Sequence, residues 1–305
     1  MNRPLRSVTR RGFLRGAALA TLGLTVGNRL EGQQEEGSGV EAPSSPAARA
    51  KVVLARDPGV VNAQGSLDLT VFGRMLDQAL CALEGVAQPE EAWKRFFGPR
   101  DRPGIKSNVY GYLRTPVEVE ELLRKRVAAC GLQEAGIPCT DREARTLLAS
   151  CTALINVRPV RNHHWSGIGG CLKNHIMFVE NPSSYHPDSC ANLGAIWQLP
   201  ILKDKTRLNI LLALRPLFYG RGPHNFDPRH QWTYGGLFVS RDPVAIDALG
   251  AELLRLKRIE HFGEDRPVTP TKHIQVAETR YGLGVSDLKR IDLVKLGWKE
   301  GILFG

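Results

Sequence analysis

The sequence contains six cysteines but lacks any Cys-x-x-Cys pair. This absence argues against a zinc ribbon and against a ferredoxin-type cluster, so we expect no iron–sulfur cofactor. Three interpretations stay open for these residues: small buried hydrophobic side chains, one disulfide between Cys130 and Cys139, or a catalytic thiolate. The positions concerned are Cys81, Cys130, Cys139, Cys151, Cys171 and Cys190.

The sequence also lacks runs of basic residues interleaved with aromatic ones. Its formal net charge of +10 is concentrated in residues 1–30, which hold six arginines and no acidic residue. The remaining residues carry 35 basic and 31 acidic side chains, a nearly balanced set. The basic isoelectric point is therefore largely a property of the leader, and we expect no nucleic-acid partner.

The leader carries a paired arginine, Arg10-Arg11, followed by Phe13-Leu14 and a weakly apolar stretch at residues 16–27. That stretch is too short to cross a bilayer as a helix, and the arrangement is typical of a twin-arginine signal. The alternative is a basic amphipathic N-terminal helix. The signal predicts export to the periplasmic or extracellular side, with the twin-arginine export machinery as a partner.

Cleavage of the leader is less well defined, because no Ala-x-Ala triplet directly follows the apolar stretch and the triplet at residues 48–50 lies late. An uncleaved leader would be the chain's one contact with a membrane. Residues 31–50 are rich in Gly, Gln, Glu, Ser, Pro and Ala, and this composition predicts a disordered linker. Residues 51–305 then form a single predicted domain.

Strand-like and helix-like runs alternate along residues 51–305, without an internal repeat. Asp141 and Asp242 are expected as helix N-caps, and Pro243 follows Asp242 at the first helical position. The alternation predicts an α/β fold with a mostly parallel sheet, helices on both faces and Rossmann-like layering. Strands are expected at 51–55, 105–109, 153–157, 208–214, 237–240 and 291–294, and helices at 69–83, 116–129, 141–149 and from 243.

Ligands of such sheets bind beyond the carboxyl ends of the strands. A glycine-rich segment there, after the strand at 153–157, contains His163, His164, Gly167, Gly170 and Lys173. Glycines allow close backbone approach, and the amides at the following helix N-terminus favour an anion. The segment predicts a site for a small anionic ligand, with simple turn formation as the alternative role of the glycines.

Each histidine of the adjacent pair, His163 and His164, is either a ligand-contacting group or an ordinary polar contact. On an extended strand the two would point opposite ways, so at most one should face a site. A metal bound through His163 or His164 with His186 or His224 is a further interpretation, in which the main metal candidates are His164, His186 and His224, although these spacings match no standard zinc pattern.

Other candidate ligand-binding residues lie in the remaining post-strand segments. Lys106 and Asn108 belong to or follow the second strand, and Gly222 lies in a glycine-rich loop after a buried strand. Asp242 and Asp247 begin the long helix at 243. Lys106 is otherwise a surface lysine, Asp242 a helix cap and Asp247 a surface carboxylate.

Several of these segments together resemble the domain of unknown function 362 family, over most of residues 51–297. The most specific match is His163-His164-x-x-Gly167-x-x-Gly170-x-Leu172-Lys173-Asn174, supported by four shorter motifs: Gly104-Ile105-Lys106-x-Asn108, Gly222-Pro223, Ser240-x-Asp242-Pro243-Val244-Ala245-x-Asp247 and Tyr281-Gly282-Leu283-Gly284. The resemblance implies an α/β domain and frequent export by the twin-arginine route, but no known reaction.

This chain departs from the family in two respects. Many members carry an iron–sulfur module that is missing here, which argues against electron transfer. Leu212 stands where members often have an aspartate, which weakens any mechanism that needs a carboxylate or a carboxylate-held metal there. A distant likeness to nickel-pincer lactate racemases rests on one short motif, a histidine followed by Gly-Gly and by a lysine ten residues after the histidine, as in His163 and Lys173.

Three hypotheses follow. The first is an exported enzyme in which His163 or His164, with a near-neutral pKa, is the acid–base group. In it Lys173 and Lys106 hold negative charge on the ligand or cofactor, and Asn174 orients it. The second is a non-catalytic exported binding protein that uses the same loop. The third is an accessory subunit of an exported redox complex.

Overall fold

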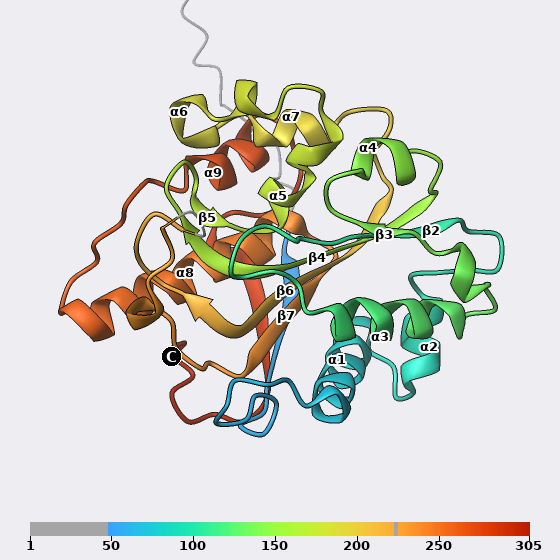
Figure 1. Cartoon of the computed structure of the whole chain (residues 1–305), viewed down its shortest axis with the longest axis horizontal. Coiled ribbons are helices and arrows are strands. Elements are labelled where there is room, and N and C mark those ends of the chain that lie inside the picture. The colour runs from blue at the N-terminus through green and yellow to red at the C-terminus, as the bar shows by residue number, and fades with distance from the viewer. Residues whose placement is uncertain (1–47, 223–224) are drawn as a thin grey trace, which may run out of the picture. The chain divides into compact units, whose positions relative to one another are not determined.

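The computed structural model describes residues 48–222 and 225–305. The signal residues Arg10 and Arg11, nearly all of the linker and the metal candidate His224 lie outside this part of the chain. The described residues belong to one compact unit built around a single mixed sheet (Figure 1).

The sheet has the strand order β3-β2-β4-β6-β7-β1-β8, with β5 paired to β4 at the side. Six strands run in one direction, while β5 and β7 run antiparallel to their neighbours. The expected mostly parallel α/β sheet is thus confirmed. The strands are β1 (Ala50–Arg56), β2 (Pro103–Lys106), β3 (Cys139–Thr140), β4 (Ala153–His163), β5 (Gly167–Gly169), β6 (Thr206–Leu217), β7 (Gly236–Ser240) and β8 (Ile291–Gly297).

Helices cover both faces of the sheet (Figure 1). Successive residues of β1 alternate between two hydrophobic cores: Val52 and Leu54 pack in one, Val53 and Ala55 in the other. The helices are α1 (Leu69–Glu84), α2 (Pro89–Lys94), α3 (Val117–Ala128), α4 (Ala144–Leu147), α5 (Cys171–Asn174), α6 (Pro187–Cys190), α7 (Leu193–Trp197), α8 (Pro243–Phe262) and α9 (Lys272–Thr279). Helices α1 to α3 pack in the core that contains Val53, and helices α5 to α9 pack in the core that contains Val52.

Asp141 does not cap a helix, contrary to the sequence-based expectation. Helix α4 begins only at Ala144, and its preceding residue makes no side-chain cap. The Asp141 carboxylate instead accepts from Lys106 Nζ at 2.6 Å and from the Val109 amide at 3.1 Å. A buried lysine competes for this carboxylate more strongly than a helix terminus, because the pair removes two isolated charges from a nonpolar surrounding.

The direction of β7 separates Asp242 from the other post-strand segments. Because β7 runs antiparallel to β6 and β1, its carboxyl end lies at the opposite edge of the sheet. Asp242 caps α8 there, accepting from the Val244 and Ala245 amides, and also accepts from the Val285 amide at 2.9 Å. Its expected capping role is confirmed, while the fold does not bring it to the edge where β2, β3 and β4 end.

None of the helices in residues 48–222 and 225–305 combines the length and the hydropathy that a membrane crossing requires.

Candidate functional site

A cavity of about 300 Å³ lies where β2, β3 and β4 end. It is lined by side chains from β4, from α5 and from the segments that follow β2 and β3. Of the residues expected from the sequence, it brings together His163, Lys173, Asn108, Asn174 and His186. The lining also contains side chains that sequence reasoning missed: Arg142, Arg158, Arg161, Asp141, Tyr110 and Trp165.

Arg158 and Arg161 place two guanidinium groups in the wall of this cavity. Their exposed fractions are 4% and 1%, and neither makes an ion pair within the described residues. Arg158 donates to the Gly170 carbonyl at 3.1 Å, Arg161 donates to Asn108 Oδ1 at 3.1 Å, and the Nε of each has no hydrogen-bond partner among the residues that the structure describes. Burial lowers the pKa of both, and most strongly that of Arg161. Both side chains therefore keep donors available to a ligand.

A signal for these arginines was present in the sequence. The expected strand ended at Val157, which placed both in a loop, whereas β4 continues to His163. Two arginines three residues apart inside an otherwise apolar strand are costly to bury without a partner.

Lys173, on α5, adds a third buried cation with an exposed fraction of 4%. Its Nζ lies 3.4 Å from Cys190 Sγ and 6.0 Å from the centre of the Trp165 ring. Burial lowers its pKa, and Arg158 lowers it further. Within the described residues no carboxylate is paired with this ammonium group.

Lys106 lies behind the cavity wall rather than in it. It is fully buried, and its Nζ donates to Asp141 and to the Ser107 carbonyl at 2.7 Å. Burial lowers the pKa of Lys106 to about 8, against the opposing effect of Asp141. Burial is the strongest effect on Asp141 and acts to raise its pKa, but the charge and hydrogen bond of Lys106, the Val109 amide and Arg142 together outweigh it, and the pKa falls below its ordinary value. Lys106 therefore fixes Asp141 and contacts no ligand space itself.

A chain of buried asparagines holds α5 against the sheet. Asn108 Nδ2 donates to Asn174 Oδ1 at 3.2 Å, and Asn174 Nδ2 donates to Asn156 Oδ1 at 2.8 Å. Asn156 Nδ2 in turn donates to Asn209 Oδ1 at 2.9 Å. Paired amides of this kind satisfy their hydrogen bonds without charge, so the floor of the cavity is rigid and already hydrogen-bonded.

His163 faces the cavity and His164 does not. The His163 Nδ1 accepts from the Trp165 amide at 3.2 Å, so the neutral ring carries its proton on Nε2. Burial, with Lys173, Arg158 and Arg161 nearby, lowers the pKa of His163 far below its ordinary value. The ring is neutral at physiological pH, in contrast to the near-neutral pKa that the sequence suggested.

The two histidine rings stack instead of pointing opposite ways. Their centres are 5.0 Å apart and their planes differ by 6°. The difference from expectation arises because β4 ends at His163 and the chain turns at His164, whose Nδ1 lies 2.7 Å from the Arg221 carbonyl.

The amides at the start of α5 are occupied by the protein's own carboxylate. Asp247, fully buried on α8, accepts from the Cys171 amide at 2.5 Å and from the Leu172 amide at 2.8 Å. Burial raises the pKa of Asp247 to about 7, although both amides act to lower it. A Cβ at Gly170 would lie 2.3 Å from Asp247 Oδ1, so glycine is required there by close approach. The sequence predicted an anionic ligand at this helix N-terminus, but the carboxylate of Asp247 occupies that position.

The two other candidate glycines, Gly167 and Gly222, are required by backbone conformation and by close contacts. Gly167 has a φ of +71°, and a Cβ there would lie 2.4 Å from the Thr269 carbonyl oxygen. Gly222 has a φ of +90° and approaches the Asn162 carbonyl oxygen. Neither lines the cavity that holds His163 and Lys173.

The metal candidates do not form a ligand set in the described part of the chain. His186 stacks on Trp165 with ring centres 3.9 Å apart, and His164 lies 4.4 Å from the same indole. Burial lowers the pKa of His186 to about 4. Residues 48–222 and 225–305 contain no cluster of three or more His, Cys, Asp or Glu suited to a metal. All six cysteines lie in this part and are free thiols, so Cys130 and Cys139 are not joined.

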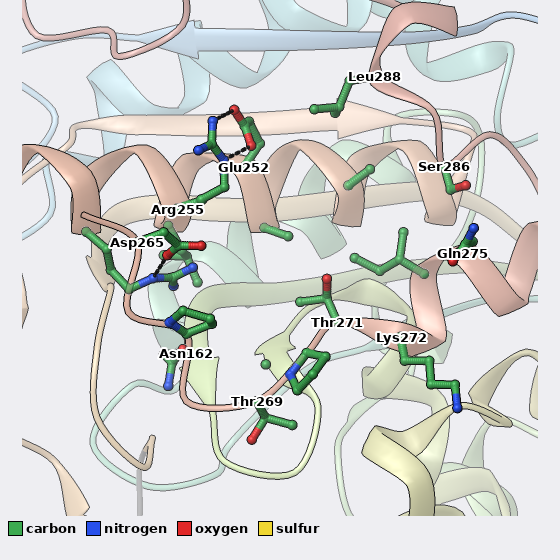
Figure 2. A pocket seen from close by; sticks show the side chains of 18 of the residues that line it. Asn162, Glu252, Arg255, Asp265, Thr269, Thr271, Lys272, Gln275, Ser286 and Leu288 are labelled. Carbon is green, nitrogen blue, oxygen red and sulfur yellow. Dashed lines mark hydrogen bonds and ion pairs between the residues drawn. The ribbon is translucent and has the colours of Figure 1, made fainter.

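A larger groove, of about 750 Å³, lies along α8 and α9 (Figure 2). Its charged side chains already neutralise one another: Arg255 pairs with Glu252 at 2.6 Å, and Arg258 with Asp265 at 2.6 Å. Lys272, at its end, pairs with Asp188. The groove therefore lacks the unpaired buried charge that marks the smaller cavity.

The fold and the cavity together define an α/β protein with a cationic pocket at the carboxyl edge of its parallel strands. Residues 111–252 match the model of the family described as "Domain of unknown function (DUF362)". The matched range contains β4, α5 and Asp247 but not Lys106 or Asn108. No curated protein and no solved structure matches the chain. The likeness to lactate racemases stays a prediction.

Proposed function

We propose that the cavity binds a small anionic ligand, and that His163 performs acid–base chemistry on it. The observation that carries the proposal is the presence of three buried cations, Arg158, Arg161 and Lys173, without an ion-paired carboxylate in the described residues. An isolated buried charge is costly, and a bound anion offsets that cost. Arginine also presents a planar fork of donors that matches carboxylate and phosphate oxygens.

His163 begins as a neutral ring that donates a hydrogen bond from Nε2. A bound anion opposes the effect of the surrounding cations and raises the pKa of His163. To accept a proton from the ligand at Nε2, the ring must carry its own proton on Nδ1 instead, which gives up the hydrogen bond from the Trp165 amide. Asn108 and Asn174 support the ligand from the rigid floor of the cavity. The acid–base chemistry therefore depends on the charge of the ligand, because the bound anion also raises the pKa of His163.

The experiment that tests this proposal is a titration with inorganic phosphate, followed by thermal unfolding. We expect phosphate to raise the unfolding temperature of the unmodified protein, and Arg161→Met to reduce that rise strongly. Arg255→Met, which removes a cation of the larger groove, is the matched control and should leave the rise intact. Equal phosphate effects in the unmodified protein and in Arg161→Met would show that the anion binds elsewhere.

We also propose that residues 1–30 direct the folded protein to the twin-arginine route. The proposal rests on Arg10-Arg11 and the weakly apolar stretch that follows them. A folded cargo is consistent with a cavity whose walls come at once from β4, from α5 and from the segments that follow β2 and β3.

A further inference from the structure

We propose that the ligand of the cationic cavity is a compact dianion, with its two negative charges on oxygens of one small molecule. This inference rests on the proposed function, since it specifies the charge of the anion that the cavity binds. It comes from the balance of buried charge around the cavity, from the hydrogen-bonding groups that its walls offer, and from its size.

The buried charges around the cavity do not cancel. Among the described residues that line or adjoin the cavity, four buried cations stand against two buried carboxylates, which leaves an excess of two positive charges. One carboxylate pairs directly with a lysine at 2.6 Å, and the other lies close enough to Arg158 to oppose the lowering of the Arg158 pKa by burial. The cations are Lys106, Arg158, Arg161 and Lys173, and the carboxylates are Asp141 and Asp247.

Groups at the rim do not change this balance. Arg142 has a side chain that is 48% exposed and lies 3.7 Å from Asp141, so solvent screens its charge. His163 and His186 are neutral, because burial and neighbouring cations lower the pKa of both. The excess of two positive charges is therefore buried, and its attraction for a bound anion is stronger there than in solvent.

The hydrogen-bonding groups of the wall favour a ligand that is rich in acceptors. Within residues 48–222 and 225–305, the Nε atoms of Arg158 and Arg161 have no hydrogen-bond partner, and Lys173 Nζ makes one hydrogen bond, to a thiol at 3.4 Å. The side-chain oxygens of Asn108 and Asn174 already accept hydrogen bonds from protein donors. The open positions are thus donors, and charged oxygens are the acceptors that bind them most strongly.

The volume limits the ligand. About 300 Å³ is at the lower end of the range for ligand sites, which excludes a dinucleotide. A tetrahedral oxyanion and a short dicarboxylate both supply two charges within this space. The two share the chemistry that the cavity recognises and are distinguished by the experiment.

The test compares dianions with monoanions of nearly the same shape, by isothermal titration of the full-length protein at pH 7.5. The tetrahedral pair is sulfate and methanesulfonate, and the dicarboxylate pair is malonate and malonamate. We expect the dianion to bind at least about tenfold more tightly than its partner in one pair or in both. A preference confined to one pair identifies which of the two chemistries fits.

A variant then tests the charge balance itself. In Lys173→Met the excess falls to one positive charge, so the dianion preference should shrink toward equality while the monoanion keeps most of its affinity. Lys203→Met, an exposed lysine, is the control and should keep the full preference. The comparison within each pair uses the unmodified protein, so it does not depend on the folding of a variant.

The outcomes separate this inference from the function on which it rests. Equal affinities within both pairs would overturn the dianion assignment while leaving anion binding in place. Absence of binding for all four probes at 10 mM and below (about the weakest affinity of interest) would overturn both. A preference that persists unchanged in Lys173→Met would show that the buried charge excess is not what selects the ligand.

Discussion

The burial of a charged side chain in the cavity, such as that of Lys173, lowers the stability of the folded protein. Lys173 is buried beside Arg158 and makes one hydrogen bond in the described part of the chain, to Cys190 Sγ. Replacing an uncompensated buried charge by an apolar side chain of similar length commonly stabilises a protein, because the desolvation cost disappears. Function and stability are therefore opposed at this position.

We predict that Lys173→Met raises the free energy of unfolding of the ligand-free protein by about 1–3 kcal/mol. The same variant should lose most of the stabilisation that phosphate gives. Urea unfolding with and without phosphate measures both effects, with Lys203→Met as the exposed control. A destabilised variant would mean that Lys173 is compensated in the free protein.

The lowered pKa values of the lysines near the cavity predict how anion binding depends on pH. The pKa of Lys106 is lowered to about 8 by burial, and that of Lys173 is lowered as well. A bound anion raises both values, so the complex holds more protons than the free protein above about pH 8. Affinity must then fall as pH rises through this region.

For sulfate, which stays doubly charged, we predict a dissociation constant that rises between pH 8 and pH 9 by up to about tenfold for each proton taken up. Titration in buffers of different ionisation enthalpy should show proton uptake by the protein at pH 8. An affinity that is constant from pH 7 to pH 9 would contradict the prediction.

At the scale of elements, α8 holds α5 in place through a single carboxylate. Asp247 bonds two amides of α5, and Gly170, just before that helix, leaves room for it. The Gly170 carbonyl also accepts from Arg158, so the same contact orients a cavity guanidinium. A substitution at Gly170 should therefore change both the stability of the protein and the geometry of the cavity.

We predict that Gly170→Ala destabilises the protein by about 1–3 kcal/mol, because the added Cβ would overlap Asp247. Phosphate binding should weaken as Arg158 shifts with the backbone. Gly136→Ala is the matched control, since a Cβ there meets nothing within 4 Å. Chemical denaturation measures the stability, and an unchanged midpoint in Gly170→Ala would refute the proposed close contact.

At the scale of the whole molecule, the chain must be folded before its cavity exists. The strands β1 and β8, from the two ends of the described part, pair in parallel at one side of the sheet. The cavity lies at the other side, around β2, β3 and β4. A route that exports folded proteins suits such an arrangement.

We predict that Arg10→Lys with Arg11→Lys abolishes export in a host with a working twin-arginine translocase. The protein should then accumulate in the cytoplasm in folded form. Arg15→Lys is the matched control within the leader and should leave export unchanged. Fractionation and immunoblotting measure the distribution, and continued export of the double variant would point to a different route.

The sequence allowed a large part of the fold to be predicted. Strong local signals, such as Asp242-Pro243 at the start of α8 and the apolar run of β6, gave the right elements. Their ends were less well predicted, because β4 continues through polar residues that the surrounding structure buries, and β6 continues past the half-buried Arg207 and the exposed Arg215. Local patterns record propensity, whereas element length depends on what packs against it.

Of the site, the sequence by itself determined the proximity of His163, Lys173 and Asn174, because a short segment after a strand can only lie near that strand's end. Only the tertiary structure decided that Arg158 and Arg161 share their cavity and that Asp242 lies at the far edge with the reversed strand β7. It also decided that Asp247, 76 residues from Cys171, occupies the helix amides. The reason is physical: charge compensation and strand direction depend on contacts between distant residues, which no local pattern encodes.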